Sequence, residues 1–233
     1  MDLNRLKKSV HEANIRLKQS GLVLFTFGNV SAVDRERGIM IIKPSGVPYD
    51  DLEPVNMVCV SLETGLALDS DLNPSSDTPT HLELYRAFKT CGGIVHSHSE
   101  YATACAQANV PIRCMGTTHA DYFYGDIPVT RRLTKRETTD NYEKNTGIVI
   151  VETFSERNPE EIQAVLVANH GPFVWGKDPF EAVHHAVIIE FLAKIDTHAR
   201  QLNPNARRPP RHLVDMHYFR KHGAKAYYGQ SKL

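Results

Sequence analysis

The stretch Gly92-Gly93-Ile94-Val95-His96-Ser97-His98-Ser99 decides the fold and the chemistry expected of this chain. Its small and apolar first half predicts a buried strand that runs up to His96. Residues two apart on a strand point to the same face, so His96 and His98 would hold two imidazoles side by side at the strand end. Two imidazoles placed in this way provide half of a zinc site.

A metal site needs further ligands, and His170 and Asp77 are the candidates. His170 lies in Ala168-Asn169-His170-Gly171-Pro172-Phe173, and Asp77 lies in Pro74-Ser75-Ser76-Asp77-Thr78. A carboxylate together with neutral imidazoles suits zinc or another first-row divalent ion. The chain has 12 histidines, and His81 and His119 remain alternative ligands. His81 ranks lower because it is expected on the helix that follows Asp77.

Three short polar turns are candidates for binding an anion. They are Gly28-Asn29-Val30-Ser31, Lys43-Pro44-Ser45-Gly46, and the Ser75-Ser76 pair directly before Asp77. Backbone N–H groups, hydroxyls and the Lys43 ammonium can together hold a phosphate. Each turn alone is ordinary, but three of them, one beside a candidate metal ligand, predict a small phosphorylated substrate.

The apolar spacing along the chain predicts helices alternating with hairpins. The predicted helices are 3–17, 80–89, 100–108, 136–145 and 179–202. The predicted strands are 22–27, 30–33, 39–42, 57–61, 66–68, 93–96 and 164–167. Short strands joined in hairpins and mixed with helices indicate an α/β or α+β fold with a largely antiparallel sheet. No repeat or boundary divides the chain, so residues 1–233 are expected to form a single domain.

Composition narrows the classes of function. The 233 residues carry 27 basic and 27 acidic side chains, a formal net charge of +0, which argues against nucleic-acid and membrane partners. No apolar run is long enough to cross a bilayer, and the N-terminus lacks the apolar core of a signal peptide. The four cysteines show no paired spacing, as expected in a reducing compartment. We expect a cytoplasmic protein, although the final Ser231-Lys232-Leu233 matches a peroxisomal signal.

Taken together, these motifs resemble the class II aldolase family, and within it the L-ribulose-5-phosphate 4-epimerases. The resemblance extends over almost the whole chain. The matching segments are Phe27–Gly38, Ile42–Val47, Pro74–His81, Gly92–Ser99, Gly116–Phe123, His170–Phe173 and Arg220–Gln230.

The resemblance implies an architecture and a set of site residues. The family fold is a three-layer α/β/α domain around a mixed, mostly antiparallel sheet. Its members form four-fold symmetric homotetramers with active sites between neighbouring subunits. By resemblance, the Zn²⁺ ligands are Asp77, His96, His98 and His170; Mn²⁺ or Co²⁺ is an alternative metal. The implied substrate-binding residues are Gly28, Asn29, Lys43, Ser45, Gly46, Ser75, Ser76 and His217.

The implied reaction converts L-ribulose 5-phosphate to D-xylulose 5-phosphate by retro-aldol cleavage and re-addition. Asp121 and Tyr228 are the implied acid and base, with Tyr228 and His217 reaching across a subunit interface. Which of Asp121 and Tyr228 serves which face of the substrate stays open. So does the pathway, for which arabinose and ascorbate catabolism are two alternatives.

Two other functions compete with an epimerase. An aldolase of the L-fuculose-phosphate type would share the metal and phosphate segments but release its fragments. Asp77, where such aldolases tend to carry glutamate, and the segment from Thr117 to Asp121 favour the epimerase. A metal-free scaffold, like the aldolase-like head of adducin, would have lost metal ligands, whereas all four candidates are present in this sequence.

Overall fold

The computed structural model describes residues 2–223 and 226–227. The helices are α1 (Leu3–Gln19), α2 (Thr78–Ala87), α3 (Glu100–Ala108), α4 (Thr117–Ala120), α5 (Lys135–Thr139), α6 (Tyr142–Thr153), α7 (Pro179–Leu202) and α8 (Arg211–Phe219). Two 3-10 turns are η1 (Tyr49–Asp51) and η2 (Pro54–Asn56). The strands are β1 (Asn29–Asp34), β2 (Ile39–Ile42), β3 (Val58–Ser61), β4 (Gly93–His96), β5 (Ala164–Leu166) and β6 (Pro172–Gly176).

The strands form one sheet in the order β3-β2-β1-β4-β6-β5, and every neighbouring pair is antiparallel. A parallel bridge joins Val129 to Leu166 beside the β5 edge. The expected mostly antiparallel sheet is therefore confirmed. In the centre, His96 pairs with Asn29 of β1 on one side and with Phe173 of β6 on the other. This register places the end of β4 between two strands that both contribute to the candidate site.

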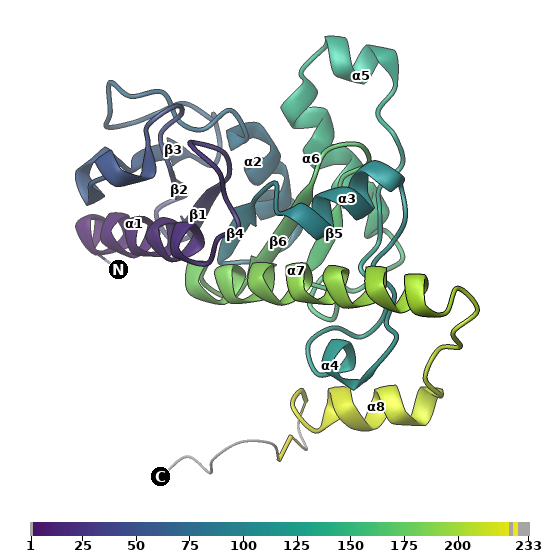
Figure 1. Cartoon of the computed structure of the whole chain (residues 1–233). Coiled ribbons are helices and arrows are strands. Elements are labelled where there is room, and N and C mark those ends of the chain that lie inside the picture. Colours follow the sequence, from purple (N-terminus) through teal and green to yellow (C-terminus); the bar gives the residue numbers. More distant parts are fainter. Residues whose placement is uncertain (1, 224–225, 228–233) are drawn as a thin grey trace.

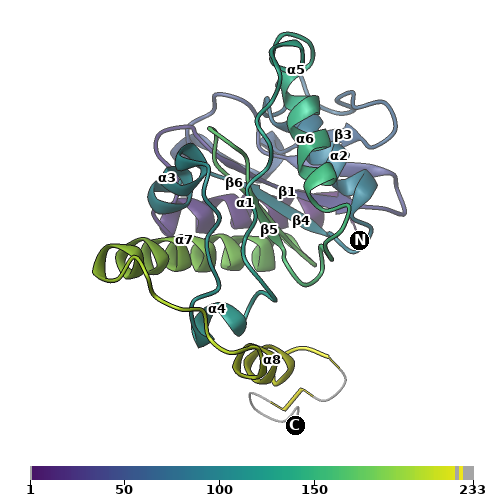
Figure 2. The same cartoon turned by 90° about the vertical axis from the view of Figure 1, so that its right-hand side faces the viewer.

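Helices cover both faces of the sheet (Figures 1 and 2). On one face, α1 contacts β1 and β2, and α7 contacts β4 and β6. On the other face, Ser31 of β1 forms hydrogen bonds with His81 and Tyr85 of α2, and α6 packs on α2. The predicted three-layer α/β/α architecture is thus confirmed. In both views α4 and α8 lie together, apart from these layers.

The glycine pair before His96 is explained by the packing of α7. A Cβ on Gly93 would lie 2.4 Å from the Pro179 nitrogen, and a Cβ on Gly92 would lie 2.0 Å from the Lys177 oxygen. Any larger side chain would push the start of α7 away from the strand. The small residues of the motif therefore set the sheet–helix distance behind the histidines.

The predicted strand over 22–27 is wrong. These residues form a loop with a turn at Phe25-Thr26, where Phe25 has a left-handed φ of 51° and a side chain that is 84% exposed. A strand requires extended backbone, which a positive φ interrupts. An apolar run alone does not distinguish a buried strand from a loop that exposes its aromatic side chains.

Smaller differences concern helix ends and short strands. The predicted helix 136–145 is two helices, α5 and α6, separated at Asn141 by a left-handed φ of 57°. The predicted strand 66–68 is reduced to a single bridge between Val60 and Ala67. Strand β6 was missed because its start at Pro172 follows a turn. Among the described residues, no helix is both long and apolar enough to cross a membrane.

Candidate metal centre

His96 is the most rigidly held of the three histidines. It ends β4, is 2% exposed, and stacks on Phe173 with the ring centroids 4.2 Å apart. Its Nδ1 lies 3.0 Å from the Pro172 oxygen. A carbonyl can only accept, so Nδ1 carries the proton and Nε2 presents a lone pair. The sheet register thus fixes the tautomer that binds metal.

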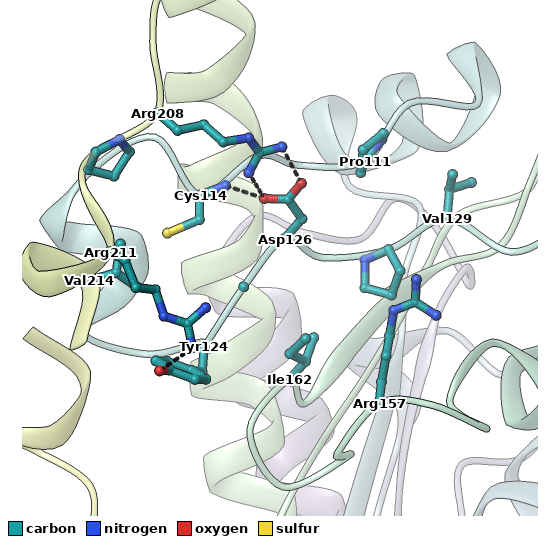
Figure 3. A pocket seen from close by; sticks show the side chains of 13 residues that line it. Pro111, Cys114, Tyr124, Asp126, Val129, Arg157, Ile162, Arg208, Arg211 and Val214 are labelled. Atoms are coloured by element: carbon teal, nitrogen blue, oxygen red, sulfur yellow. Dashed lines mark hydrogen bonds and ion pairs between the residues drawn. The ribbon is translucent and has the colours of Figure 1, made fainter.

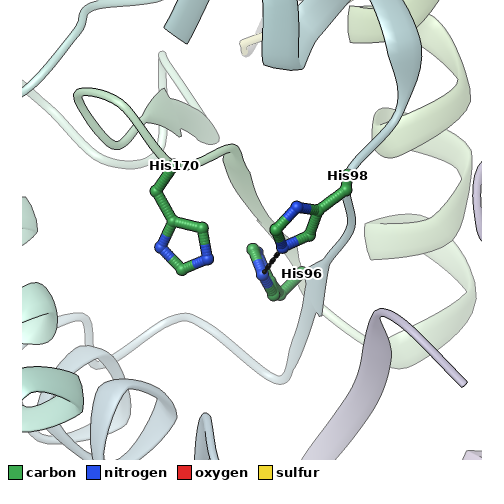
Figure 4. A group of neighbouring side chains, drawn as sticks. All are labelled: His96, His98 and His170. Atoms are coloured by element: carbon green, nitrogen blue, oxygen red, sulfur yellow. Dashed lines mark hydrogen bonds between the residues drawn. The ribbon is translucent and has the colours of Figure 1, made fainter. Parts of the chain in front are cut away.

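His98 and His170 bring their rings to the same place (Figure 4). One ring nitrogen from each of His96, His98 and His170 lies within 4.8 Å of the others, and the Nε2 atoms of His96 and His98 are 3.1 Å apart. Zn–N bonds of about 2.0–2.1 Å in a tetrahedral site would separate two nitrogens by ~3.3 Å. The three imidazoles therefore fit a divalent first-row ion.

The electrostatics of the site favour neutral imidazoles. Burial, together with the neighbouring His98, lowers the pKa of His96 to about 3. Burial also lowers the pKa of His170 to about 3, with further contributions from His96 and His98. A metal binds the neutral form, so no proton has to be displaced from these rings near neutral pH.

Asp77 faces the same centre from the start of α2. Its Oδ2 lies 4.0 Å from the His96 Nε2 and accepts a hydrogen bond of 2.7 Å from the Asn29 Nδ2. Asn29 also donates to the Ser75 hydroxyl at 3.1 Å, and its own Oδ1 is buried without a hydrogen-bond partner among the described residues. Asn29 therefore orients the carboxylate and keeps an acceptor free beside it.

A cavity of about 360 Å³ opens over this centre. The predicted phosphate-binding turns form its walls, and the predicted metal ligands form another part of its lining. The lining residues are Thr26, Phe27, Gly28, Asn29, Lys43, Pro44, Ser45, Gly46, Ser75, Ser76, Asp77, His96, His98, Tyr142, Glu143 and His170. The structure thus brings together residues predicted from segments far apart in the sequence.

Lys43 supports the cavity wall. The residue is 1% exposed, and its ammonium donates to the backbone oxygens of Val47 at 2.9 Å and Pro44 at 3.3 Å. Burial lowers its pKa to about 8. Much of the donor capacity of this cation is therefore directed at the Lys43–Val47 loop.

Asp121 and His217 lie elsewhere in the chain. Asp121 follows α4, and its carboxylate accepts from Arg220 at 2.8 Å and from the His217 Nδ1 at 3.0 Å. Burial raises the pKa of Asp121, but hydrogen bonds from Arg220 and His217 outweigh burial and bring the pKa below its ordinary value. In the described part of the chain, neither Asp121 nor His217 lines the cavity. Tyr228 lies outside the described residues.

The alternative ligands occupy separate buried positions. The His81 Nδ1 lies 2.7 Å from the Ser31 hydroxyl, and burial lowers the pKa of His81 to about 3. The His119 Nε2 lies 2.6 Å from the Gly125 oxygen, and burial lowers its pKa to about 4. Within the described residues, the three-histidine group includes neither of them.

Tyr142 and Glu143 were missed by the sequence analysis. Both line the cavity, and the Tyr142 hydroxyl lies 3.2 Å from the His170 Nδ1. They follow the break at Asn141 and belong to no metal or phosphate motif. Only the packing of α6 against α2 brings them to the centre.

A second cavity, of about 610 Å³, lies between α8 and the segment 111–129 (Figure 3). Arg208 at its edge pairs with both carboxylate oxygens of Asp126, and Arg211 pairs with Asp215 at 2.9 Å. These arginines are largely neutralised by carboxylates. Among the described residues, the group of side chains that could hold a metal lies at the first cavity and not at this one.

Comparisons with known proteins identify the family and the fold of this chain. The family described as class II aldolase and adducin N-terminal domain matches residues 8–197. An L-fuculose 1-phosphate aldolase structure is 24% identical, covers 93% of this chain and 95% of its own, and has a TM-score of 0.78.

Two further structures show the same fold. L-fuculose 1-phosphate aldolase from Glaciozyma antarctica PI12 is 16% identical, with 96% of this chain and 84% of that chain covered and a TM-score of 0.77. L-fuculose-1-phosphate aldolase from Thermus thermophilus is 23% identical, with 87% of this chain and 99% of that chain covered and a TM-score of 0.68.

Proposed function

The chain belongs to the class II aldolase and adducin N-terminal domain family, and we propose that it is a metal-dependent L-ribulose-5-phosphate 4-epimerase. The observation that carries the metal-dependent sugar-phosphate chemistry is the convergence of three neutral histidines and Asp77 on a cavity walled by serines and glycines. A scaffold without a metal would have no need for this arrangement. An aldolase would share these groups, so the choice of an epimerase rests on Asp77 and on the segment from Thr117 to Asp121.

The proposed metal is Zn²⁺, held by His96, His98 and His170 with Asp77 as the fourth ligand. A divalent ion bound there supplies a Lewis acid that stabilises negative charge on a substrate oxygen. The turns around Gly28, Ser45 and Ser75 supply N–H and O–H donors for a phosphate. The cavity volume of about 360 Å³ suits a small sugar phosphate.

Inversion at carbon 4 of a ketopentose phosphate cannot proceed by simple deprotonation, because that carbon bears no acidic proton. Removing the proton of the 4-hydroxyl instead lets the adjacent carbon–carbon bond break and re-form on the other face of the aldehyde. This sequence needs proton acceptors and donors on two sides of the carbon. We assign them to Asp121 and Tyr228.

This assignment implies a site shared between subunits. Asp121 and His217 lie at the α4–α8 contact, and in the part of the chain that the structure describes neither of them lines the cavity. A homotetramer in which α8 of one subunit approaches the cavity of its neighbour would complete the site. The position of Asp121 away from the cavity, among the described residues, supports the proposed assembly.

A sugar-phosphate aldolase is the second candidate, favoured by the fold shared with L-fuculose 1-phosphate aldolases. The purified protein should convert L-ribulose 5-phosphate to D-xylulose 5-phosphate, and a chelator should stop the conversion. The same preparation should condense dihydroxyacetone with glycolaldehyde phosphate much more slowly. Net condensation without epimerisation would replace the epimerase by the aldolase, and neither activity in the metal-loaded protein would overturn both.

A further inference from the structure

The three histidines differ in how their rings are held. His96 belongs to a central strand and donates to a backbone carbonyl. His170 belongs to the turn between β5 and β6, directly after Asn169, which has a left-handed φ of 62°. Its ring is half-buried, and its Nδ1 lies 3.2 Å from the Tyr142 hydroxyl. A side chain outside the metal-ligand motifs is thus the partner of this ligand.

The protonation state of His170 sets the direction of its hydrogen bond with Tyr142. A neutral imidazole that offers Nε2 to a metal carries its proton on Nδ1. The His170 Nδ1–H then donates to the Tyr142 oxygen, which has lone pairs to accept it. This bond selects one tautomer of His170 and fixes the rotation of its ring.

Tyr142 can perform this role because its own position is fixed. It is the first residue of α6, and its backbone oxygen accepts from the Thr146 hydroxyl at 2.9 Å. The next backbone oxygen, of Glu143, accepts from the Thr80 hydroxyl of α2 at 2.6 Å. A Cβ on Gly147 would lie 2.6 Å from the Glu83 Cβ, so α6 and α2 are in close contact.

We propose that Tyr142 is a positioning residue that orients His170 for metal binding and thereby sets the metal affinity of the site. The α2–α6 contact holds Tyr142 beside the turn that bears His170. Tyr142 would have this role whichever sugar phosphate the protein uses, because the role involves only the proposed metal and the residues that hold it.

The test uses Co²⁺ alone, added to metal-free protein and followed by its visible absorption and by competition with a chelator. Tyr142→Phe should weaken Co²⁺ binding about 10–100-fold, as expected for loss of a partner to a metal ligand. Tyr101→Phe, a half-buried tyrosine outside the cavity, should bind Co²⁺ like the unmodified protein. Equal affinities for Tyr142→Phe and the unmodified protein would overturn the proposal.

A double-mutant cycle separates positioning from general damage. In the His170→Ala background, Tyr142→Phe should cause no further loss of Co²⁺ affinity, because its effect passes through His170. If Tyr142→Phe lowers Co²⁺ affinity by the same factor in the His170→Ala protein as in the unmodified protein, Tyr142 does not act through His170. These outcomes are read without turnover, so they stand apart from any failure of the proposed epimerase activity.

Discussion

The histidine cavity and the Asp121 cluster are two polar regions built in opposite ways. In the cavity, the neutral imidazole of His96 is held by a backbone carbonyl and a stacked ring, and that of His170 lies beside a tyrosine hydroxyl. At the α4–α8 contact, the Asp121 carboxylate is surrounded by Arg220, His217 and Lys221. The first region is complete enough within one chain to hold a metal. The second places a charged carboxylate outside the cavity that the described residues of its own chain form.

Removing a metal ligand from the histidine cavity should have the largest effect on metal affinity and on activity. His98→Ala removes an exposed ligand without opening a core cavity, so Co²⁺ affinity should fall by more than about 100-fold, the upper end expected for loss of an outer partner. Epimerase activity should disappear with it. Calorimetric titration of Co²⁺ checks this, with His184→Ala, an exposed histidine outside the cavity, as the control. Unchanged affinity in His98→Ala would remove this residue from the centre.

Removing the charge of Asp121 should lower turnover and leave metal binding unchanged. Asp121→Asn should lower kcat by about 10²–10⁴, the range for loss of a general acid or base. Its Co²⁺ affinity should equal that of the unmodified protein. Asp126→Asn, which removes another ion-paired carboxylate, should keep its kcat. Normal turnover in Asp121→Asn would reduce Asp121 to a structural role.

Mixing the two damaged proteins tests whether the regions meet between subunits. His98→Ala and Asp121→Asn proteins, dissociated and reassembled together, should regain activity that neither has alone. Some interfaces would then combine an intact cavity with an intact Asp121. Mixed oligomers that stay inactive would contradict a shared site.

The smallest expected effect is on the pH dependence of stability, where a buried neutral histidine and the ion-paired Asp121 carboxylate should differ. His81 has a folded pKa of about 3, so the unfolded chain binds its proton first as pH falls below about 6.5. Stability from this group is present above that pH and is lost on acidification, by ~1.4 kcal/mol per pH unit.

The measurement is the unfolding free energy of metal-free protein between pH 6 and 4.5. His81→Gln should flatten the slope by about one proton. Arg220→Gln should not change the slope between pH 6 and 4.5. The pKa of the Asp121 carboxyl lies below the ordinary value of 3.8, so this carboxylate stays ionised over that range. An unchanged slope in His81→Gln would show that His81 is not the buried neutral group described.

The local sequence determined much of this protein. The short runs Val30–Val33 and Ile39–Ile42 on either side of the polar segment 34–38 predicted the hairpin, and helical spacing predicted α7, because both patterns are local. The two-residue spacing of His96 and His98 likewise predicted neighbouring imidazoles, which the structure confirms. The same reasoning failed at Phe25, where a left-handed backbone broke an apolar run.

Tertiary structure decided what pattern could not. The sheet register brings Asn29 and Phe173 to either side of His96, and the α2–α6 contact brings Tyr142 to His170. Asp121 is directed to α8 instead of the cavity. These arrangements depend on contacts between segments far apart in the chain, and local spacing carries no information about which distant segments will pack together.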